Sequence, residues 1–208
     1  MTNMLNDYAE RMPAPRRSVL ALAVLSMLTE EPMHPYRMQV LIKERRKDAV
    51  VNVSQRNSVY QTIQRLVRDG LVETAATERA ENRPERTTYR ITDAGRTTLT
   101  EWLRTMLSTP AQEYAEFPAA LSFLPNLAPR DATVMLTARA ARLEERLAAL
   151  DAETTQISEF LPRLFAIESE YQRQVVATEL AYVRSLIEDL RAERITWPFV
   201  DGAPVWRG

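Results

Sequence analysis

The sequence predicts a mainly α-helical protein made of an N-terminal winged helix-turn-helix with a two-stranded β wing, followed by a C-terminal antiparallel helical or coiled-coil dimerisation domain. Three observations support this fold class. A polar helix over 54–69 precedes two short strands, two further helices come before it, and leucines recur every seven residues from Leu136. The expected divisions are a flexible tail at 1–16, a winged-helix domain at 17–109, a linker at 110–118, a dimerisation domain at 119–195 and a tail at 196–208.

Composition excludes several classes of protein. The chain has 208 residues, no Cys, one His and four Gly. Disulfides, zinc fingers, thiol catalysis and Gly-rich phosphate loops are therefore not expected, and we predict no enzyme activity, catalytic residue, metal or cofactor. No apolar run is long enough to cross a membrane, and residues 1–12 lack the apolar run of a signal peptide, so we expect a cytoplasmic protein without membrane contact.

The net charge of −1 conceals two halves of opposite sign. Residues 1–110 contain 17 Lys and Arg against 13 Asp and Glu, a net charge of +4, whereas residues 111–208 contain 10 against 15, a net charge of −5. The basic half holds the polar helix. This modest surplus is compatible with a partner that carries negative charge, such as DNA.

Two helices are expected before the polar one. The apolar segment 18–28 predicts a buried helix. Pro35 is well placed in the first turn of a second helix that reaches about Lys47, with inward-facing side chains at Tyr36, Val40 and Leu41. The basic cluster that ends this helix is either a solvated helix end or a contact for DNA phosphates; it comprises Lys43, Arg45, Arg46 and Lys47.

The helix over 54–69 is predicted to read DNA. Val59, Ile63, Leu66 and Val67 form an apolar stripe that must face a core, and Gly70 can end the helix in the left-handed conformation. Polar side chains on the other face can hydrogen-bond base edges or phosphates in the major groove. The candidate DNA contacts on this helix are Ser54, which also caps it, Gln55, Arg56, Asn57, Ser58, Tyr60, Gln61, Gln64 and Arg65, with Arg68 on the same face. For Tyr60, packing beneath the helix and phosphate contact both remain open.

A β hairpin and a further helix complete this domain. Strands are expected at 71–75 and 87–91, and Arg83 and Arg86 in and beside the turn are candidates for holding the wing against DNA. Thr92 is predicted to cap the next helix. The apolar side chains of that helix face a partner surface and comprise Leu99, Trp102, Leu103 and Met106.

The remaining sequence predicts long helices that need a partner. A short helix is expected at 119–124, and Pro129 can open a long helix that Pro162 ends near Leu161. Its heptad seam consists of Leu136, Ala140, Leu143, Leu147, Leu150, Thr154, Ile157, Leu161 and Leu164, and a final helix carries Val176, Leu180, Val183, Ile187 and Leu190, widened by Tyr171, Val175, Tyr182 and Leu186. Two faces this broad favour a homodimer; the alternative is a monomer whose helices fold back on the N-terminal domain.

As an ordered set, several segments resemble the PadR family of transcriptional regulators. They are residues 20–28, Pro32-Met33-His34-Pro35-Tyr36, residues 57–66, Asp69-Gly70-Leu71-Val72, and the run from Tyr89 to Gly95. The family usually has His-Gly-Tyr at 34–36 and Leu-Tyr-Pro at 59–61, so Gln61 brings a side-chain donor that implies a different base preference. The resemblance gives His34 a turn-stabilising role.

The resulting hypothesis is a homodimeric, ligand-responsive repressor that binds a pseudopalindromic operator in double-stranded DNA. By resemblance, a small hydrophobic or aromatic effector would bind near the dimer interface. The candidate residues for that interface or effector site are Trp102, Met106, Leu143, Leu147, Leu150, Val183 and Ile187. The alternatives are a coiled-coil protein-interaction module whose winged helix contacts protein, and a MarR-like regulator that responds to another class of ligand.

Overall fold

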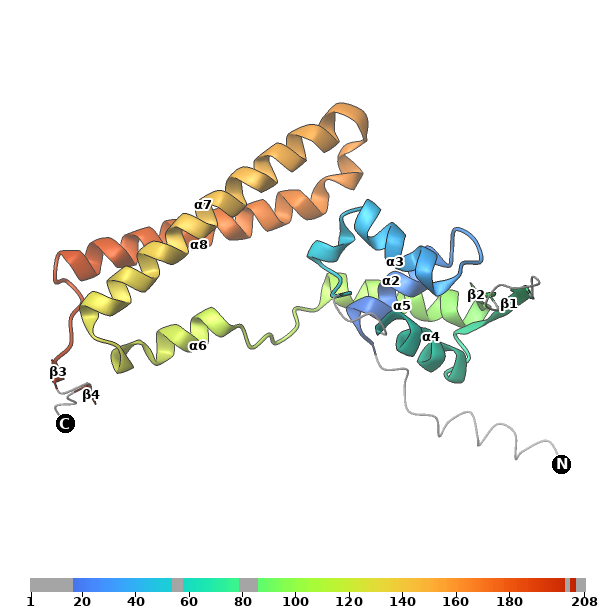
Figure 1. The fold of residues 1–208 in the computed structure, drawn as a ribbon, viewed down its shortest axis with the longest axis horizontal. Helices are drawn as coiled ribbons and strands as arrows, with labels where there is room; N and C mark the ends of the chain where they lie inside the picture. The colour runs from blue at the N-terminus through green and yellow to red at the C-terminus, as the bar shows by residue number, and fades with distance from the viewer. Residues whose placement is uncertain (1–16, 54–57, 79–85, 201–202, 205–208) are drawn as a thin grey trace. The chain divides into compact units, whose positions relative to one another are not determined.

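The computed structural model describes residues 17–53, 58–78, 86–200 and 203–204, and it divides the chain into two compact units. Unit 1 spans Met1–Gln112 and unit 2 spans Glu113–Gly208. Unit 1 contains four labelled helices and one β hairpin, whereas unit 2 is dominated by two long helices that form a hairpin (Figure 1). The predicted fold class, mainly helical with a winged helix and C-terminal helices, is confirmed.

Helix α2 (Val19–Met27) begins at a side-chain cap supplied by Ser18. The Ser18 hydroxyl accepts a hydrogen bond from the Ala21 backbone N–H at 3.1 Å, which satisfies one of the N–H groups that have no partner within the helix. Ala21, Val24 and Leu25 are fully buried in the core of unit 1. The predicted buried helix over 18–28 is thus confirmed.

Helix α3 (Pro35–Glu44) ends earlier than predicted. Arg46 has a φ of 53°, in the left-handed region that stops a helix of L-residues, and a short 3-10 helix, η1 (Lys47–Ala49), follows. Met38, Leu41 and Ile42 form the buried face. The prediction that Tyr36 faces inward was wrong: this side chain is 65% exposed, because it lies two residues, about 200° of helical rotation, from Met38.

Helix α4 (Ser58–Arg68) has the predicted apolar stripe. Val59, Ile63 and Leu66 are buried in the core that α2 and α3 also line. The helix ends in a Schellman motif, because the N–H groups of Gly70 and Leu71 donate to the carbonyls of Val67 and Leu66 at 3.0 and 2.9 Å. Gly70 has a φ of 72°, as its predicted role requires.

The wing consists of strands β1 (Val72–Glu78) and β2 (Arg86–Ile91), which pair antiparallel with Val72 opposite Ile91 and Thr74 opposite Tyr89. Both strands extend beyond the predicted ranges, and the register shifts between Thr74 and Ala76. Met33 adds an isolated antiparallel bridge to Tyr89. The wing is therefore anchored to the segment that connects α2 to α3.

Helix α5 (Asp93–Ser108) begins at a crowded junction with the wing. The Thr92 hydroxyl accepts a hydrogen bond from Gly95 N–H at 3.0 Å and donates to the Gly70 carbonyl at 2.8 Å. A Cβ added to Gly95 would lie 2.1 Å from the Leu71 carbonyl oxygen and 2.7 Å from Ile91 Cγ1. Only glycine fits here without a shift of the backbone, which explains the Thr-Asp-Ala-Gly sequence physically.

Unit 2 begins with α6 (Glu116–Ser122) and the 3-10 helix η2 (Leu124–Asn126), so the short helix starts inside the segment expected to be a linker. Helix α7 (Pro129–Phe160) begins at Pro129 and ends beside Leu161, both as predicted. After the 3-10 helix η3 (Arg163–Phe165), α8 (Ile167–Arg191) returns along α7 (Figure 1). The core between these helices comprises Leu136, Ala140, Leu180, Val183, Leu186, Ile187 and Leu190.

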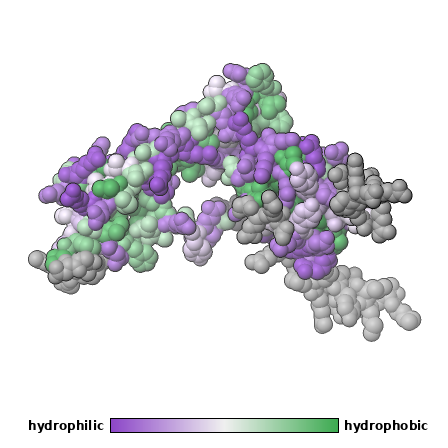
Figure 2. Space-filling model, in the orientation of Figure 1, coloured by the Kyte–Doolittle hydropathy of each residue, from purple (hydrophilic) through white to green (hydrophobic). Residues whose placement is uncertain are grey.

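Two parts of the predicted apolar faces lie outside this core. Leu161 and Leu164 follow the end of α7 and are 49% and 71% exposed, because Pro162 stops the helix before the heptad pattern ends. Tyr171, Val175 and Tyr182, expected to widen the buried face of α8, are also exposed. Figure 2 shows hydrophobic residues in green at the surface of unit 2.

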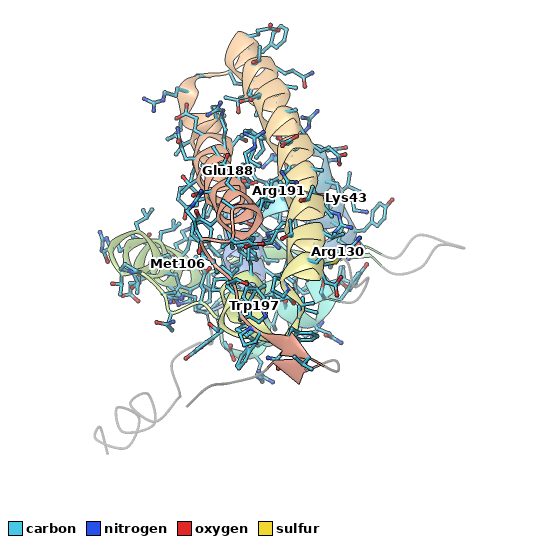
Figure 3. All side chains as sticks on the ribbon, turned by 90° about the vertical axis from the view of Figure 1, so that its left-hand side faces the viewer. Lys43, Met106, Arg130, Glu188, Arg191 and Trp197 are labelled. Atoms are coloured by element: carbon cyan, nitrogen blue, oxygen red, sulfur yellow. The ribbon has the colours of Figure 1, made fainter. Side chains whose placement is uncertain are left out.

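The C-terminal segment docks on unit 2. Trp197 packs against its core, and Trp197 Nε1–H donates to the Leu127 carbonyl at 2.8 Å. It lies at the end of the hairpin where α7 begins, near Arg130, and α8 ends, near Arg191 (Figure 3). Beyond it, the short strands β3 (Phe199–Val200) and β4 (Ala203–Pro204) pair antiparallel.

Candidate nucleic-acid interface

The outward face of α4 brings together polar side chains over a rigid core. Gln61, Gln64 and Arg68 are exposed and follow each other at i, i+3 and i+7, which places them on one side of the helix, opposite the buried Val59 and Ile63. Tyr60 flanks this row and is 41% exposed. Such a row of donors and acceptors on an outward helix face can hydrogen-bond base edges in a major groove.

One flank of α4 is tied to the start of α2. Arg65 Nη2 donates to the Ser18 hydroxyl at 3.1 Å, while Arg65 Nε is buried and has no hydrogen-bond partner among the residues that the structure describes. Ser18 also caps α2, so this contact joins the predicted reading helix to the N-terminus of another helix. Arg65, predicted to contact DNA, is half-buried and turned toward Ser18, which suits a phosphate at the groove edge better than a base.

The other flank of α4 faces the wing. Gln64 Nε2–H donates to the Tyr89 hydroxyl at 3.4 Å, and the Tyr60 ring lies edge-on to His34, with 6.3 Å between ring centroids. Sequence reasoning gave Tyr89 no role beyond strand β2. The position of Tyr89 in the predicted strand does not show that its hydroxyl reaches the edge of α4.

The single histidine has the structural role that the resemblance implied. His34 Nδ1 accepts a hydrogen bond from the Tyr36 backbone N–H at 3.1 Å and so caps α3. The unprotonated nitrogen in this contact is an acceptor. His34 therefore stabilises the turn that holds Met33 against the wing.

Several predicted contacts fall outside what the structure describes. Ser54, Gln55, Arg56, Asn57 and Arg83 lie in segments whose placement is not described, and only the backbone of Arg86 is described. Ser58 lies at the start of α4, is half-buried and already has an interaction partner within the protein. Their proposed roles at DNA remain predictions.

Ion pairs neutralise part of the positive charge of unit 1. Arg45 makes a two-pronged contact with Glu30, at 2.5 and 2.7 Å, and Arg90 pairs with Glu73 at 2.6 Å. The hydrogen bonds from Arg45 hold the pKa of the Glu30 carboxyl below its usual value of 4.5. Within the predicted basic cluster, Arg45 thus already has a carboxylate partner and is less suited to a phosphate.

The predicted interface residues of the C-terminal half mostly form the core of their own unit. Leu150 and Val183 are fully buried, Ile187 is 6% exposed, and Leu143 and Leu147 are half-buried against the same core. Trp102 likewise packs in the core of unit 1 at 9% exposure, because the interior of that unit needs its large ring. Met106 is the predicted interface residue with an exposed side chain.

A groove in unit 2 could accommodate a small molecule. It has a volume of about 590 Å³ and lies between α6, η2 and the first half of α7. Its walls are mainly apolar, including Phe117, Leu124 and Met135. Arg142 adds a positive charge to the lining, and Arg139 lines the same groove but donates a hydrogen bond to Glu179 at 2.6 Å. Among the residues that the structure describes, no cluster of His, Asp or Glu could hold a metal ion.

Two antiparallel strands anchored beside a helix with a polar outward face, backed by two further helices, define a winged-helix unit of the kind that binds DNA. Within this class, residues 24–101 match the transcriptional regulator PadR-like family. This match confirms, for the winged-helix segment, the resemblance seen in the sequence. The matched family is one of transcriptional regulators. No helix in the described part of the chain is both long and apolar enough to span a membrane.

Solved structures share the fold across both units. Bacillus subtilis PadR in complex with operator DNA aligns with 83% of this chain and 99% of its own, at 18% identity and a TM-score of 0.65. The same protein in complex with p-coumaric acid aligns with 84% and 99%, at 17% identity and a TM-score of 0.67. The Vibrio cholerae virulence activator AphA aligns with 84% and 99%, at 17% identity and a TM-score of 0.63. A comparison with curated proteins found no match.

Proposed function

We propose that the protein is a homodimeric, ligand-responsive repressor that binds a pseudopalindromic operator through α4 and the wing. The observation that carries this proposal is the exposed row of Gln61, Gln64 and Arg68 on α4, held over a buried stripe of the same helix. A helix that presents amide and guanidinium groups outward is suited to base edges and phosphates in a major groove. The family match over residues 24–101 and a structurally similar protein solved in complex with operator DNA support the same role.

The homodimer is supported by uncovered apolar surface on unit 2. Val175 and Tyr182 on α8 and Met135 on α7 are 46%, 54% and 57% exposed. Val175 and Tyr182 line one shared hollow beside α6, and an apolar surface of this kind marks an interface in many proteins. A two-fold dimer would present two copies of α4 to successive major-groove faces, and this symmetry predicts a palindromic site.

Ligand response is supported by the groove beside α6. Its apolar walls and the guanidinium group of Arg142 suit a small hydrophobic or aromatic molecule, including one that carries an acidic group, whereas Arg139 is already paired with Glu179. Such a ligand would regulate DNA binding only if it prefers one spacing of the two reading helices. A solved relative holds p-coumaric acid, whereas another is an activator by name, so both the effector and the direction of regulation require experiments.

DNA binding is tested by selecting fragments from genomic DNA with the purified full chain and titrating the selected site by fluorescence anisotropy. Gln61→Ala should lower the preference for this site over random DNA. Arg68→Ala should instead weaken binding to all sequences and flatten the salt slope by about one unit, if Arg68 contacts one phosphate. The matched control is Arg104→Ala, an exposed arginine on α5, which should change neither quantity.

The outcomes separate the alternatives. No saturable binding to any fragment at low salt would contradict the proposal and favour a protein-interaction module. If the Gln61→Ala protein preferred the selected site over random DNA as strongly as the wild-type protein does, Gln61 would not be a base-reading residue. A reporter gene placed behind the selected site then distinguishes a repressor, which the proposal requires, from an activator.

The dimer is tested by the oligomeric state in solution. Val175→Lys places a charge on the exposed apolar face of α8 and should shift the sedimentation equilibrium toward the monomer. Ala181→Lys, at another exposed position of α8 away from the hollow beside α6, adds the same charge and is the matched control. A monomeric wild-type protein at micromolar concentration would contradict the proposed dimer.

A further inference from the structure

The contact between α4 and strand β2 joins the proposed reading helix to the wing. Gln64 is exposed on α4, and its Nε2–H donates to the Tyr89 hydroxyl at 3.4 Å. Tyr89 is half-buried and packs against the core of unit 1. This hydrogen bond therefore joins an exposed side chain, Gln64, to a side chain that packs against the core, Tyr89.

Tyr89 is held in place from two directions. Its backbone N–H donates to the Met33 carbonyl and its carbonyl accepts from Met33 N–H, each at 3.0 Å. On its other edge, Tyr89 is paired with Thr74 of β1. Because backbone and ring are both constrained, the hydroxyl is a fixed point beside α4.

Gln64 gains order from this fixed point. A long exposed glutamine side chain loses up to about 1.5–2 kcal/mol of rotamer entropy when it is immobilised. A hydrogen bond formed in the free protein removes part of that cost before any ligand binds. Tyr60, one turn earlier, lies edge-on to His34, so this side of α4 is braced at a second position.

The remaining hydrogen-bonding groups of Gln64 match one base. Its amide has two protons and one acceptor oxygen, and Tyr89 takes one proton. When Tyr89 accepts the Nε2 proton that points away from Oε1, the other proton and Oε1 lie side by side and are left for a ligand. Adenine offers the complementary pair in the major groove, an N7 acceptor and an N6 donor, to which glutamine binds in a bidentate manner.

We propose that Tyr89 is a positioning residue that holds the Gln64 amide for the recognition of adenine in the major groove. This proposal rests on the proposed DNA-binding function and extends it to a strand residue that does not itself read a base. Tyr89 acts through Gln64, so its influence is confined to one base pair in each half-site.

The experiment uses the DNA site selected by the wild-type protein and its single-base variants. The position read by Gln64 is the one at which Gln64→Ala loses its preference. Tyr89→Phe keeps the buried ring and removes only the hydroxyl; it should lower the preference for adenine at that position by about two- to tenfold, the weight of one neutral hydrogen bond. Preferences at other positions should stay unchanged. Tyr36→Phe, at an exposed tyrosine of α3, is the matched control.

A double-mutant cycle separates positioning from a structural effect. In the Gln64→Ala background, adding Tyr89→Phe should have no further effect on base preference. An effect of Tyr89→Phe that persists in this background, that is equal at all positions, or that is absent would overturn the proposal. A preference of the wild-type protein for another base at the Gln64 position would also overturn it. If the wild-type protein binds no DNA, the proposed function fails first; if it binds and discriminates normally without the hydroxyl, only the role of Tyr89 fails.

Discussion

The helices of unit 1 and unit 2 begin in different ways. In unit 1, α2, α3 and α5 each start at a side chain that accepts a backbone N–H, namely Ser18, His34 and Thr92. In unit 2, none of α6, α7 and α8 has a side-chain hydrogen bond at its N-cap. Side-chain caps thus mark these helix starts in unit 1, whereas in unit 2 only α7 has a local signal at its start, Pro129.

The two units also differ in how completely they bury apolar side chains. Among the described residues, unit 2 has the larger share of exposed large hydrophobic side chains, including Tyr171, Val175 and Tyr182 on α8 alone. Unit 1 buries Val59, Ile63 and Leu66 of the α4 stripe and partly buries Val67. Unit 1 therefore has the features of a domain specified by its own sequence, and unit 2 those of a domain that needs a partner, as the proposed dimer supplies.

The largest effect is expected where unit 1 is most tightly specified. Gly95→Ala should lower the free energy of unfolding of unit 1 by about 3 kcal/mol or more, because the new Cβ would meet the Leu71 carbonyl and Ile91. Hydrogen exchange of the α4 and α5 amides during a denaturant series measures this loss in the full chain. Protection of α7 and α8 should change much less, since they belong to the other unit.

Gly70→Ala is the matched control for this substitution. Nothing lies within 4 Å of a Cβ added at Gly70, but its φ of 72° disfavours any L side chain. The expected loss is about 1 kcal/mol, from backbone strain alone. A larger loss at Gly70 than at Gly95 would show that backbone conformation, and not the close approach of the wing, limits unit 1.

The fold of unit 1 could be predicted because each boundary has a local chemical cause. Thr92, Gly70 and Pro35 were placed in their capping or stopping roles from sequence, and the structure confirms all three. The end of α3 was missed because it depends on the left-handed conformation of Arg46, a residue type with no preference for that region.

The candidate site was predicted less completely, because helical periodicity gives the face of a residue but not its partners. Gln61 and Gln64 were placed correctly on the exposed face of α4. The contacts of Arg65 with Ser18 and of Tyr89 with Gln64 join residues 47 and 25 positions apart. Trp102 was assigned to an interface because a large aromatic residue on an amphipathic helix suits an interface and a domain core equally well.

A moderate effect is expected at the C-terminal anchor of unit 2. Trp197→Ala should destabilise unit 2 by roughly 2 kcal/mol, less than at a fully buried tryptophan because this ring is half-buried. Thermal unfolding together with hydrogen exchange of α7 measures the change. Trp197→Phe keeps an aromatic ring and removes the hydrogen bond to Leu127, so it should destabilise unit 2 less than Trp197→Ala does. If both variants lost the same stability, the hydrogen bond alone, and not packing of the ring, would account for the contribution of Trp197.

A smaller effect is expected at the junction of three helices in unit 2. Arg139 on α7 lies 3.7 Å above the Phe117 ring of α6, and its Nε–H donates to Glu179 of α8 at 2.6 Å. Arg139→Gln should lower the stability of unit 2 by about 1 kcal/mol, because both contacts are partly exposed to solvent. Arg142→Gln, on an exposed part of the same groove, is the control and should have a smaller effect in the same denaturant titration.

The smallest effect is expected from an ion pair in unit 1, and it should appear only with changing pH. Arg45 lowers the pKa of Glu30, so the stability that this pair contributes is present above the usual carboxyl pKa of 4.5 and is lost as the pH falls through the lowered value. Glu30→Gln should therefore reduce stability at pH 7 by less than about 1 kcal/mol, since both side chains are nearly half exposed, and should have a smaller effect at an acidic pH below the lowered pKa of Glu30. Urea midpoints for unit 1 at the two pH values, compared with those of Glu31→Gln, measure the difference. If Glu30→Gln had the same effect at both pH values, Glu30 would stabilise unit 1 through packing of its side-chain stem and not through its charge. Packing would then be the source of stability at this turn of unit 1, as it is between the helices of unit 2.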